Sequence, residues 1–262
     1  MYKFGFIGMG SMGSSMMRGC LSAVDAGELA FTRKDAEKGQ AVSKETGVPF
    51  LKTNSELAAA CSCLILAVKP VFYPQVLEEI RPVLVPQAIL VSLAPDYTIA
   101  QLKSALGEDV RIVRAMPNTP ARVGEGMTGI AFSEDVFSEE ERHLLDTFFT
   151  SFGRVEEVPE RLMDAVTAAS GSSPAFVYMM IEALADGVVM AGMPRSQAYR
   201  FVAQAVLGSA KMVLESGEHP GVLKDAVCSP GGTTIAGVAA LEADGFRSSL
   251  IRAASVVAEK CR

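Results

Sequence analysis

The segment CSPGGTT, residues 228–234, contains no charged side chain, yet its residue types could bind an anion. The proline and the two glycines predict a turn, and the apolar spacing after them predicts a helix that begins at Thr234. The first turn of a helix has backbone N–H groups without intrahelical partners, and such groups can hold a carboxylate. From these residues alone, a simple turn in which a threonine caps the helix is an equally good interpretation.

A second segment, GMGSMG at residues 8–13, could bind a phosphate. It follows the apolar run KFGFI and precedes a predicted helix over residues 14–23. Its spacing matches G-x-G-x-x-G, in which Gly8 permits a tight turn, Gly10 lets the backbone approach a pyrophosphate, and Gly13 lets the helix pack on the strand. Because a strand precedes the motif and a helix follows it, a dinucleotide-binding loop is favoured over a plain glycine turn.

The residues after the second predicted strand, ELAFT, indicate which dinucleotide the chain prefers. An NAD enzyme places an acidic residue about 20 positions after the glycine loop, against the ribose 2′-hydroxyl. This chain has Thr32, Arg33 and Lys34 there, and a hydroxyl with two cations suits a 2′-phosphate. The sequence therefore favours NADPH, with NADH possible. Asp35 is expected to cap the following helix, and its contact with a ribose stays open.

Two proline-containing turns end the fourth and fifth predicted strands, AVKP at residues 67–70 and SLAP at residues 92–95. Ligands of an open parallel sheet bind outside the carboxyl ends of its strands, so we expect both turns to line the nicotinamide half of the cofactor. Lys69 is the charged residue of these turns. A solvent-exposed lysine in front of a rigid proline turn is its alternative interpretation.

The chain offers few conventional acid–base groups or metal ligands, with two histidines and five cysteines. His143 lies in the charged stretch SEEERHLLD and is expected at the surface. His219 precedes Pro220 near the CSPGGTT segment, and its role as a proton relay stays open. Cys228 is expected to be a core thiol rather than a nucleophile. The cysteine spacing contains no pair of CxxC motifs, so we predict no metal site.

Two patterns along the chain must supply the elements that position these segments. Through residues 1–158, short apolar runs alternate with helical patterns, which is typical of βαβ units around a parallel sheet. Through residues 159–262, apolar residues recur at helical spacing and strand signals are almost absent. We therefore predict an α/β fold, with an N-terminal Rossmann-type domain followed by an all-helical domain. Breaks between the helices are expected at residues 171–174, 192–194, 217–220 and 230–232.

Composition limits the partners of this chain. The formal net charge of -6, without a run of lysines or arginines, argues against a nucleic-acid-binding face. A mean hydropathy of +0.27 favours burial of surface between subunits, and thus an oligomer. The apolar stretch 174–193 carries Glu182 and Asp186 on one helical face, so we predict a buried helix rather than a membrane span. The N-terminus shows no signal-peptide pattern, which favours a cytoplasmic location.

Further segments, taken with those above, resemble a known family. RAMPNTP at 114–120 and SGSSPAF at 170–176 occur beside GMGSMG, AVKP and CSPGGTTIAGVAALE. This combination resembles the pyrroline-5-carboxylate reductases over essentially the entire chain. The resemblance implies reduction of L-1-pyrroline-5-carboxylate to L-proline by hydride transfer from NAD(P)H, the last step of proline biosynthesis. It also implies a Rossmann domain and a helical domain that forms a homodimer through intertwined helices, often assembling into a larger homo-oligomer.

The resemblance further implies two sets of site residues. The substrate-binding set is Gly231, Gly232, Thr233 and Thr234. Within it, Thr234 is the implied catalytic residue, whose hydroxyl hydrogen-bonds the ring nitrogen. The cofactor-binding set is Gly8, Met9, Gly10, Ser11, Met12, Gly13, Thr32, Arg33, Asn54, Ala67, Val68, Lys69, Pro70, Leu93 and Ala94.

Some positions carry a second expectation or depart from the family pattern. Asn54 is also expected to cap the helix that starts at Ser55. Pro95 and Asp96 stand where the family often has a small residue and a glycine. This departure leaves the backbone of the nicotinamide turn open.

Three other functions stay open. A paralogue of the family could reduce a related cyclic imine, such as a six-membered one. A 3-hydroxy-acid dehydrogenase of the same two-domain build uses a lysine of the helical domain as acid or base, and SGSSPAFVYMM contains none. A non-catalytic regulator that binds NADP would keep the glycine loop, although the intact PGGTT argues weakly against it.

Overall fold

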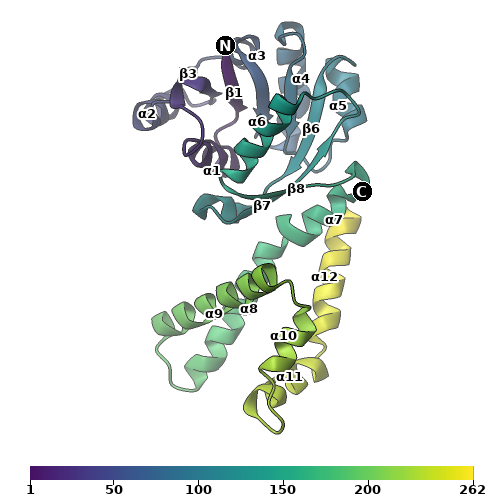
Figure 1. Cartoon of the computed structure of the whole chain (residues 1–262). Coiled ribbons are helices and arrows are strands. Elements are labelled where there is room, and N and C mark those ends of the chain that lie inside the picture. Colours follow the sequence, from purple (N-terminus) through teal and green to yellow (C-terminus); the bar gives the residue numbers. More distant parts are fainter. Residues whose placement is uncertain (262) are drawn as a thin grey trace. The chain divides into compact units, whose positions relative to one another are not determined.

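A computed structural model describes residues 1–261 of the chain (Figure 1). These residues form two compact units, one comprising Met1–Ser172 with the chain from Val257 onward, the other comprising Ser173–Val256. The strands of the described chain all belong to the first unit, and the second unit is helical. The predicted domain boundary after residue 158 follows the change from strands to helices, so it lies earlier in the chain than the boundary between the compact units.

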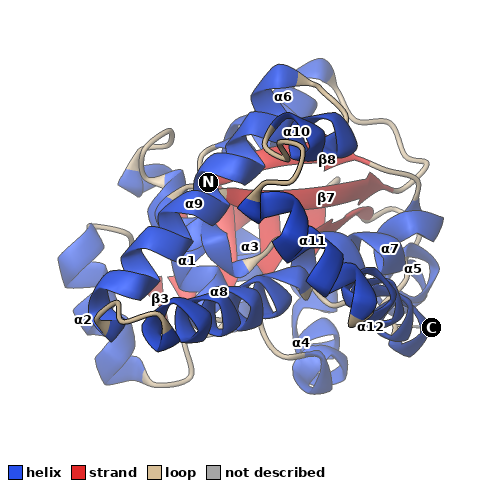
Figure 2. Ribbon diagram, turned by 90° about the horizontal axis from the view of Figure 1, so that it is seen from below, coloured by secondary structure: helices blue, strands red, loops and turns tan. Residues whose placement is uncertain are grey.

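The first unit is built on a sheet of eight strands in the order β3-β2-β1-β4-β5-β6-β7-β8. Figure 2 shows strands of this sheet, among them β7 and β8, in red. The strands are β1 (Tyr2–Ile7), β2 (Leu29–Thr32), β3 (Phe50–Leu51), β4 (Cys61–Leu66), β5 (Ile89–Ser92), β6 (Arg111–Met116), β7 (Gly126–Phe132) and β8 (Gly153–Glu157). Neighbouring strands are parallel except β6 and β7, so the sheet predicted to be parallel is mixed. The connection from Met116 to Gly126 is too short for the crossover that a parallel pair needs.

Helices cover both faces of this sheet. They are α1 (Ser11–Cys20), α2 (Ala36–Thr46), α3 (Asn54–Ala60), α4 (Tyr73–Ile80), α5 (Ile99–Leu106) and α6 (Glu139–Thr150). α1 and α6 contribute Met16 and Phe148 to the hydrophobic core on one face. α3, α4 and α5 contribute Leu57, Leu77 and Leu102 to the core on the other face. This arrangement confirms the predicted Rossmann-type domain.

The start of α3 differs from the expectation. α3 begins at Asn54, and Thr53 is its N-cap. The Thr53 hydroxyl accepts the Glu56 N–H at 3.1 Å, and the Glu56 carboxylate accepts the Thr53 N–H at 3.2 Å. The expectation that Asn54 caps this helix is therefore wrong, because this reciprocal capping box already satisfies the helix start. The Asn54 amide is left to bond elsewhere.

The second unit consists of helices joined by short loops. The helices from its approach onward are α7 (Met163–Val166), α8 (Ser173–Met190), α9 (Arg195–Ser216), α10 (Pro220–Ala226), α11 (Thr233–Ala243) and α12 (Phe246–Lys260). The break predicted at 171–174 is confined to Ser172, which lies between a π-helical segment, Thr167–Gly171, and the start of α8. Ser172 donates its N–H to the Thr167 carbonyl at 2.8 Å, which continues the wider turn. Pro174 is tolerated because it lies in the first turn of α8, where no intrahelical N–H bond is lost.

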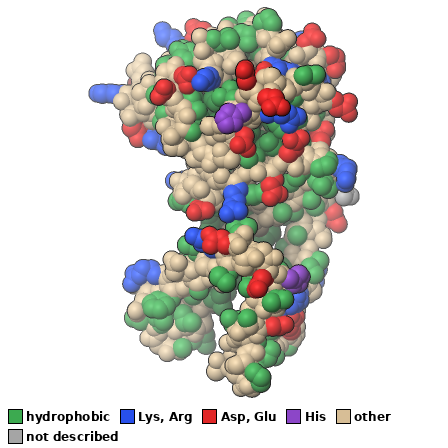
Figure 3. Space-filling view, in the orientation of Figure 1, with side chains coloured by type: hydrophobic (Ala, Val, Ile, Leu, Met, Phe, Trp, Pro, Cys, Tyr) green, Lys and Arg blue, Asp and Glu red, His purple; other side chains and the backbone are tan. Residues whose placement is uncertain are grey.

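The second unit has almost no core of its own. Within its described residues, only Ala185 and Ala198 are buried. Met179 and Met190 of α8 are 68% and 90% exposed, and Figure 3 shows apolar side chains at the surface of these helices. The apolar surface that this unit buries is too small to stabilise it by itself. Its exposed apolar side chains therefore indicate a surface that a partner covers.

The expectation of a buried helix over 174–193 is wrong for the single chain. α9 packs along α8, but it covers only part of the α8 surface. One helical stretch, Glu160–Met190, is long and apolar enough to cross a membrane by length and composition, and 6% of its apolar window is buried. A single stretch of this kind is weak evidence for a membrane, since helices that pack against other protein surfaces have the same composition.

Candidate active site

The glycine loop joins β1 to α1 with the geometry that a phosphate-binding turn requires. Gly8 has a φ of +99°, a left-handed conformation that favours glycine. A Cβ at Gly13 would lie 2.2 Å from the Gly8 carbonyl oxygen, so α1 packs closely on the loop. A Cβ at Gly10 would meet no atom of the described chain within 4 Å, which leaves space for a ligand. The N–H groups of the first turn of α1, from Ser11 onward, are then available to an anion.

The apolar members of the predicted cofactor set support the loop from the core side. Met9 is buried, and Met12 packs against the same hydrophobic core. Val68 packs against the core on the opposite face of the sheet, where Ala94 is also buried. The side chains of Met9 and Met12 therefore point to the core, and their backbone N–H groups are the parts that can contact a ligand.

A chain of hydrogen-bonded side chains lies at the end of β2. The Thr32 hydroxyl donates to Asn54 Oδ1 at 2.7 Å, and Asn54 Nδ2 donates to Glu79 Oε2 at 2.8 Å. Thr32 is buried, so its hydroxyl proton is committed to Asn54. The structure thus brings two predicted cofactor residues together and adds Glu79 of α4, which no sequence motif contained.

The acid that follows the cations after β2 forms its ion pair with another residue. Asp35 caps α2, as expected, by accepting the Lys38 N–H at 3.1 Å, and it forms an ion pair with Lys38 Nζ at 3.0 Å. The hydrogen bond from the Lys38 backbone, and then that from its side chain, hold the pKa of Asp35 below its ordinary value. Across residues 1–261, Arg33 and Lys34 form no ion pair, so both cations are available to a phosphate.

The two turns predicted to line the nicotinamide half of the cofactor are neighbours. β4 and β5 are adjacent in the sheet, and their last residues, Leu66 and Ser92, pair with each other. Residues 67–70 and 92–95 therefore lie at the same carboxyl edge. Lys69 is exposed at the start of a short 3-10 turn, which places its ammonium group in contact with solvent.

A buried tyrosine, absent from the predicted site residues, joins these two turns. The Tyr73 hydroxyl donates to the Leu66 carbonyl at 3.0 Å. It accepts hydrogen bonds from the Leu93 N–H at 3.1 Å and from Ser92 Oγ at 3.2 Å. Burial raises the pKa of Tyr73 to about 12, so the phenol keeps its proton near neutral pH. The sequence could have indicated Tyr73, because it stands at an apolar position of a helix and the hydroxyl of a buried tyrosine needs a hydrogen-bond partner.

The predicted substrate segment, residues 231–234, forms the start of α11. Gly231 has a φ of +67°, and Gly232 is the N-cap of a helix that begins at Thr233, one residue earlier than expected. The alternative in which a threonine caps this helix is therefore wrong, because both threonines lie inside its first turn. Thr234 is exposed, and its hydroxyl has no hydrogen-bond partner among the residues that the structure describes.

Known proteins match this chain along its length. Residues 160–262 match the family model for pyrroline-5-carboxylate reductase dimerisation, and residues 3–96 match that for NADP oxidoreductase, coenzyme F420-dependent. The pyrroline-5-carboxylate reductase of Escherichia coli (strain K12) is 45% identical over 260 residues, which cover 98% of this chain and 96% of that protein. The chain belongs to the pyrroline-5-carboxylate reductase family.

Other pyrroline-5-carboxylate reductases are similar in sequence and structure. That of Pisum sativum is 38% identical over 262 residues, which cover 100% of this chain and 95% of that protein. The structure of the Plasmodium falciparum enzyme with NADP bound has 33% identity and a TM-score of 0.89, covering 99% of this chain and 97% of that one. The Coxiella burnetii structure has 31% identity and a TM-score of 0.92, with the same coverage. The predicted family and fold class are confirmed, and NADP in the Plasmodium enzyme agrees with the predicted cofactor.

The acid–base candidates of this pyrroline-5-carboxylate reductase homologue take surface or capping positions. His143 is exposed on α6, as expected. His219 caps α10, since its Nδ1 accepts the Gly221 N–H at 3.1 Å. A proton relay through His219 would then use its other ring nitrogen. Cys228, expected as a core thiol, is only half-buried, because the turn between α10 and α11 lies at the surface of its unit.

Proposed function

We propose that the chain reduces L-1-pyrroline-5-carboxylate to L-proline with NADPH as the hydride donor. The observation that carries this proposal is the open start of α11, where the Thr234 hydroxyl lies beside unpaired backbone N–H groups. Residues 228–234, which contain this helix start, have no charged side chain. A site of this kind suits a zwitterionic substrate, with a carboxylate that the backbone N–H groups bind and a protonated imine that needs only a hydroxyl partner.

The chemistry asks little acid–base work of the protein. A protonated cyclic imine is electrophilic before it binds, and bound NADPH supplies the hydride that reduces its carbon. The protein must orient the imine carbon toward the nicotinamide, and such positioning can contribute about 7–11 kcal/mol of barrier lowering. A strong general acid is not required, which accounts for a site without a dedicated histidine.

The substrate is held by the first turn of α11 in this proposal. The N–H groups of Thr233 and Thr234 bind the carboxylate, and Gly231 supplies the left-handed turn that presents them. The Gly232 N–H already donates to the Ser229 carbonyl at 3.0 Å, so Gly232 borders the substrate and closes the turn. The Thr234 hydroxyl hydrogen-bonds the ring nitrogen and stabilises the amine as it forms. Thr234 is thus the residue that distinguishes catalysis from simple anion binding.

The cofactor is held at the carboxyl edge of the sheet. The backbone N–H groups of residues 9–12 bind the pyrophosphate, and Arg33 binds the 2′-phosphate. Asn54 borders the ribose, held in place by Thr32 and Glu79. The nicotinamide half is bordered by the two strand-end turns. Their proposed contact residues are Ala67, Val68, Lys69, Pro70, Leu93 and Ala94.

An absorbance assay tests the proposed reaction. We expect the purified protein to consume NADPH when given L-1-pyrroline-5-carboxylate, with a smaller kcat/KM for NADH because Arg33 and Lys34 favour the phosphate. The six-membered cyclic imine is measured in parallel, and the ratio of the two kcat/KM values shows which ring the protein prefers. If neither cofactor is consumed with either imine, the enzyme is not a reductase of this class and a non-catalytic role gains support.

We also propose that the second unit forms a homodimer, with larger homo-oligomers built from such dimers. The exposed apolar side chains of this unit and the dimerisation family that it matches support the proposal. A dimer interface would also account for the apolar stretch Glu160–Met190 without a membrane. A cytoplasmic location stays a prediction from the N-terminal sequence.

Met179→Glu is expected to shift the protein from dimer to monomer at micromolar concentration, because it places a charge among apolar side chains that a partner would bury. Light scattering after size-exclusion chromatography measures the change. Val136→Glu is the matched control, since Val136 is 87% exposed in the first unit. Equal masses for the two variants would argue against an interface at this part of α8.

A further inference from the structure

A buried arginine holds the turn that follows β5. Arg114 of β6 is 5% exposed and pairs with Ser92 in the sheet. Its guanidinium donates to the Pro95 carbonyl at 2.7 Å and to Glu160 Oε1 at 2.9 Å. Arginine is almost never buried to this degree unless it is paired, so this position indicates a specific structural demand.

The same carboxylate oxygen holds the start of the next helix. Glu160 Oε1 also accepts the N–H of Ile99, the first residue of α5, at 2.7 Å. That N–H has no intrahelical partner, so the carboxylate satisfies a group that the helix leaves open. Arg114 and Glu160 together therefore hold both ends of residues 95–99.

The beginning of the turn is held separately. The Leu93 N–H donates to the buried Tyr73 hydroxyl, and the Ala94 N–H donates to Ser92 Oγ at 3.4 Å. Tyr73 and Ser92 thus fix the first two residues after the strand, while Arg114 fixes the third through its carbonyl. Buried side chains thus hold the backbone from the end of β5 to Pro95, and the half-buried Glu160 holds the start of α5.

We propose that Arg114 and Glu160 are positioning residues for hydride transfer. The inference rests on the proposed function, in which Leu93 and Ala94 border the nicotinamide half of the cofactor. By bonding Pro95 and Ile99, the ion pair fixes the turn that borders the nicotinamide in the proposed function. Catalysis is sensitive to such placement, since a displacement of about 1 Å can cost a factor of about 100 in rate.

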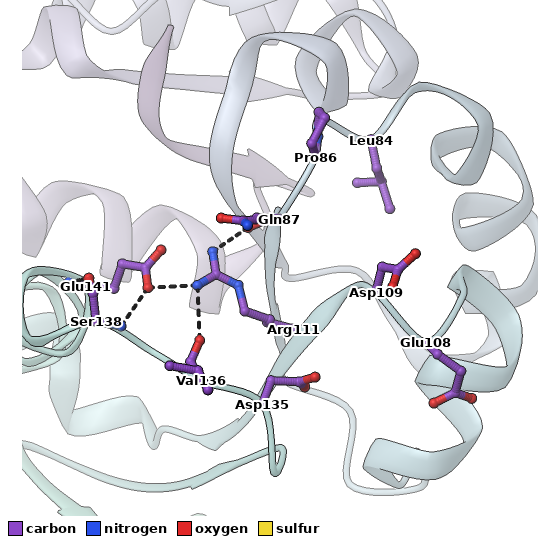
Figure 4. A pocket seen from close by; sticks show the side chains of 10 residues that line it. All are labelled: Leu84, Pro86, Gln87, Glu108, Asp109, Arg111, Asp135, Val136, Ser138 and Glu141. Carbon is purple, nitrogen blue, oxygen red and sulfur yellow. Dashed lines mark hydrogen bonds and ion pairs between the residues drawn. The ribbon is translucent and has the colours of Figure 1, made fainter.

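The chain contains a matched control for this pair on the same strand. Arg111, at the amino end of β6, donates to Glu141 Oε2 at 2.6 Å and to the backbone carbonyl of Gln87. Figure 4 shows this guanidinium among the residues of a pocket at the amino ends of the strands. Its side chain is 12% exposed, and its Nε, like that of Arg114, is buried without a partner in the described chain. The two arginines differ mainly in position: Arg111 bonds the backbone at the amino edge of the sheet, and Arg114 bonds it at the carboxyl edge.

Steady-state kinetics of Arg114→Met and Arg111→Met, with stability measured by urea unfolding, test the proposal. For Arg114→Met we expect kcat per folded enzyme to fall about tenfold, while the Kd for NADPH changes less than about twofold. The primary isotope effect with NADPH deuterated at the transferred position should rise, because hydride transfer becomes slower than the other steps. Arg111→Met should lose stability without changing kcat or the isotope effect.

Two further variants cover the case in which Arg114→Met fails to fold. Glu160→Gln keeps an acceptor for the Ile99 N–H but removes the charge, and it should show a smaller fall in kcat with a smaller rise in isotope effect. Arg114→Lys keeps the charge and should recover part of kcat. If kcat and the isotope effect of Glu160→Gln and Arg114→Lys equal those of Arg111→Met, the positioning role is wrong. An unmodified enzyme that reduces no imine would overturn the proposed function, and this inference with it.

Discussion

Thr234→Ala is expected to lower kcat/KM for L-1-pyrroline-5-carboxylate about 100-fold, while the Kd for NADPH stays within about twofold of its original value. The loss of one well-placed hydrogen-bonding group that acts on the reacting centre typically has this size. The Thr234 hydroxyl has no partner in the described part of the chain and does not cap α11. Its removal should therefore leave the free energy of unfolding within about 0.5 kcal/mol of the original.

Thr234→Ser is the control for this prediction. Serine keeps the hydroxyl and should retain most of kcat/KM, since only a methyl group is removed from an exposed position. Stopped-flow or steady-state consumption of NADPH measures both variants. Equal kinetics for Thr234→Ala and the unmodified enzyme would remove Thr234 from its proposed role and leave the substrate held by backbone groups alone.

Arg33→Glu is expected to weaken NADPH binding about 100-fold and NADH binding only slightly. A charge-assisted hydrogen bond to a phosphate contributes about 1.5–3 kcal/mol, and the substitution also places a negative charge beside it. A change of about 3 kcal/mol corresponds to this factor. In the unmodified protein the Asp35 carboxylate is bonded to Lys38, so it forms no ion pair with the neighbouring Arg33.

Lys44→Glu is the control for the charge change. Lys44 is exposed in the last turn of α2, so its replacement alters the net charge equally at the other end of the same helix. Kd values for NADPH and NADH from fluorescence titration give the comparison. Equal losses of both dinucleotides in Arg33→Glu would contradict recognition of the 2′-phosphate by this residue.

The elements of the first unit follow from local sequence. β1 and the glycine loop form where the apolar run and the three glycines place them. α1 spans Ser11–Cys20 rather than the predicted 14–23, because the end of the glycine loop, including Gly13, forms its first turn. α5 begins at Ile99 and ends at Leu106, because Thr98 caps it and Gly107 ends it. Signals of this kind act over a few residues, so they can be recognised without the fold.

The errors have one local cause and one that lies outside the single chain. Asn54 is not the cap of α3, because the reciprocal bonds of Thr53 and Glu56 take that role, and Asn54 bonds Thr32 and Glu79 instead. The helix over 174–193 is exposed in the single chain, although its composition favours burial. The apolar composition of this helix indicates that its surface is covered. It does not indicate whether the same chain or another copy covers that surface.

By itself, the sequence determined the family, the two kinds of structure along the chain and the segments proposed to bind cofactor and substrate, because these depend on local motifs. Only the tertiary structure placed Tyr73 between the ends of β4 and β5, and Arg114 against Pro95 and Glu160. Arg114 and Glu160 are 46 positions apart in the chain. Contacts of this range arise from strand order and helix packing, for which single-sequence patterns carry no signal. The motifs of this protein are local, whereas the side chains that hold them in position are not.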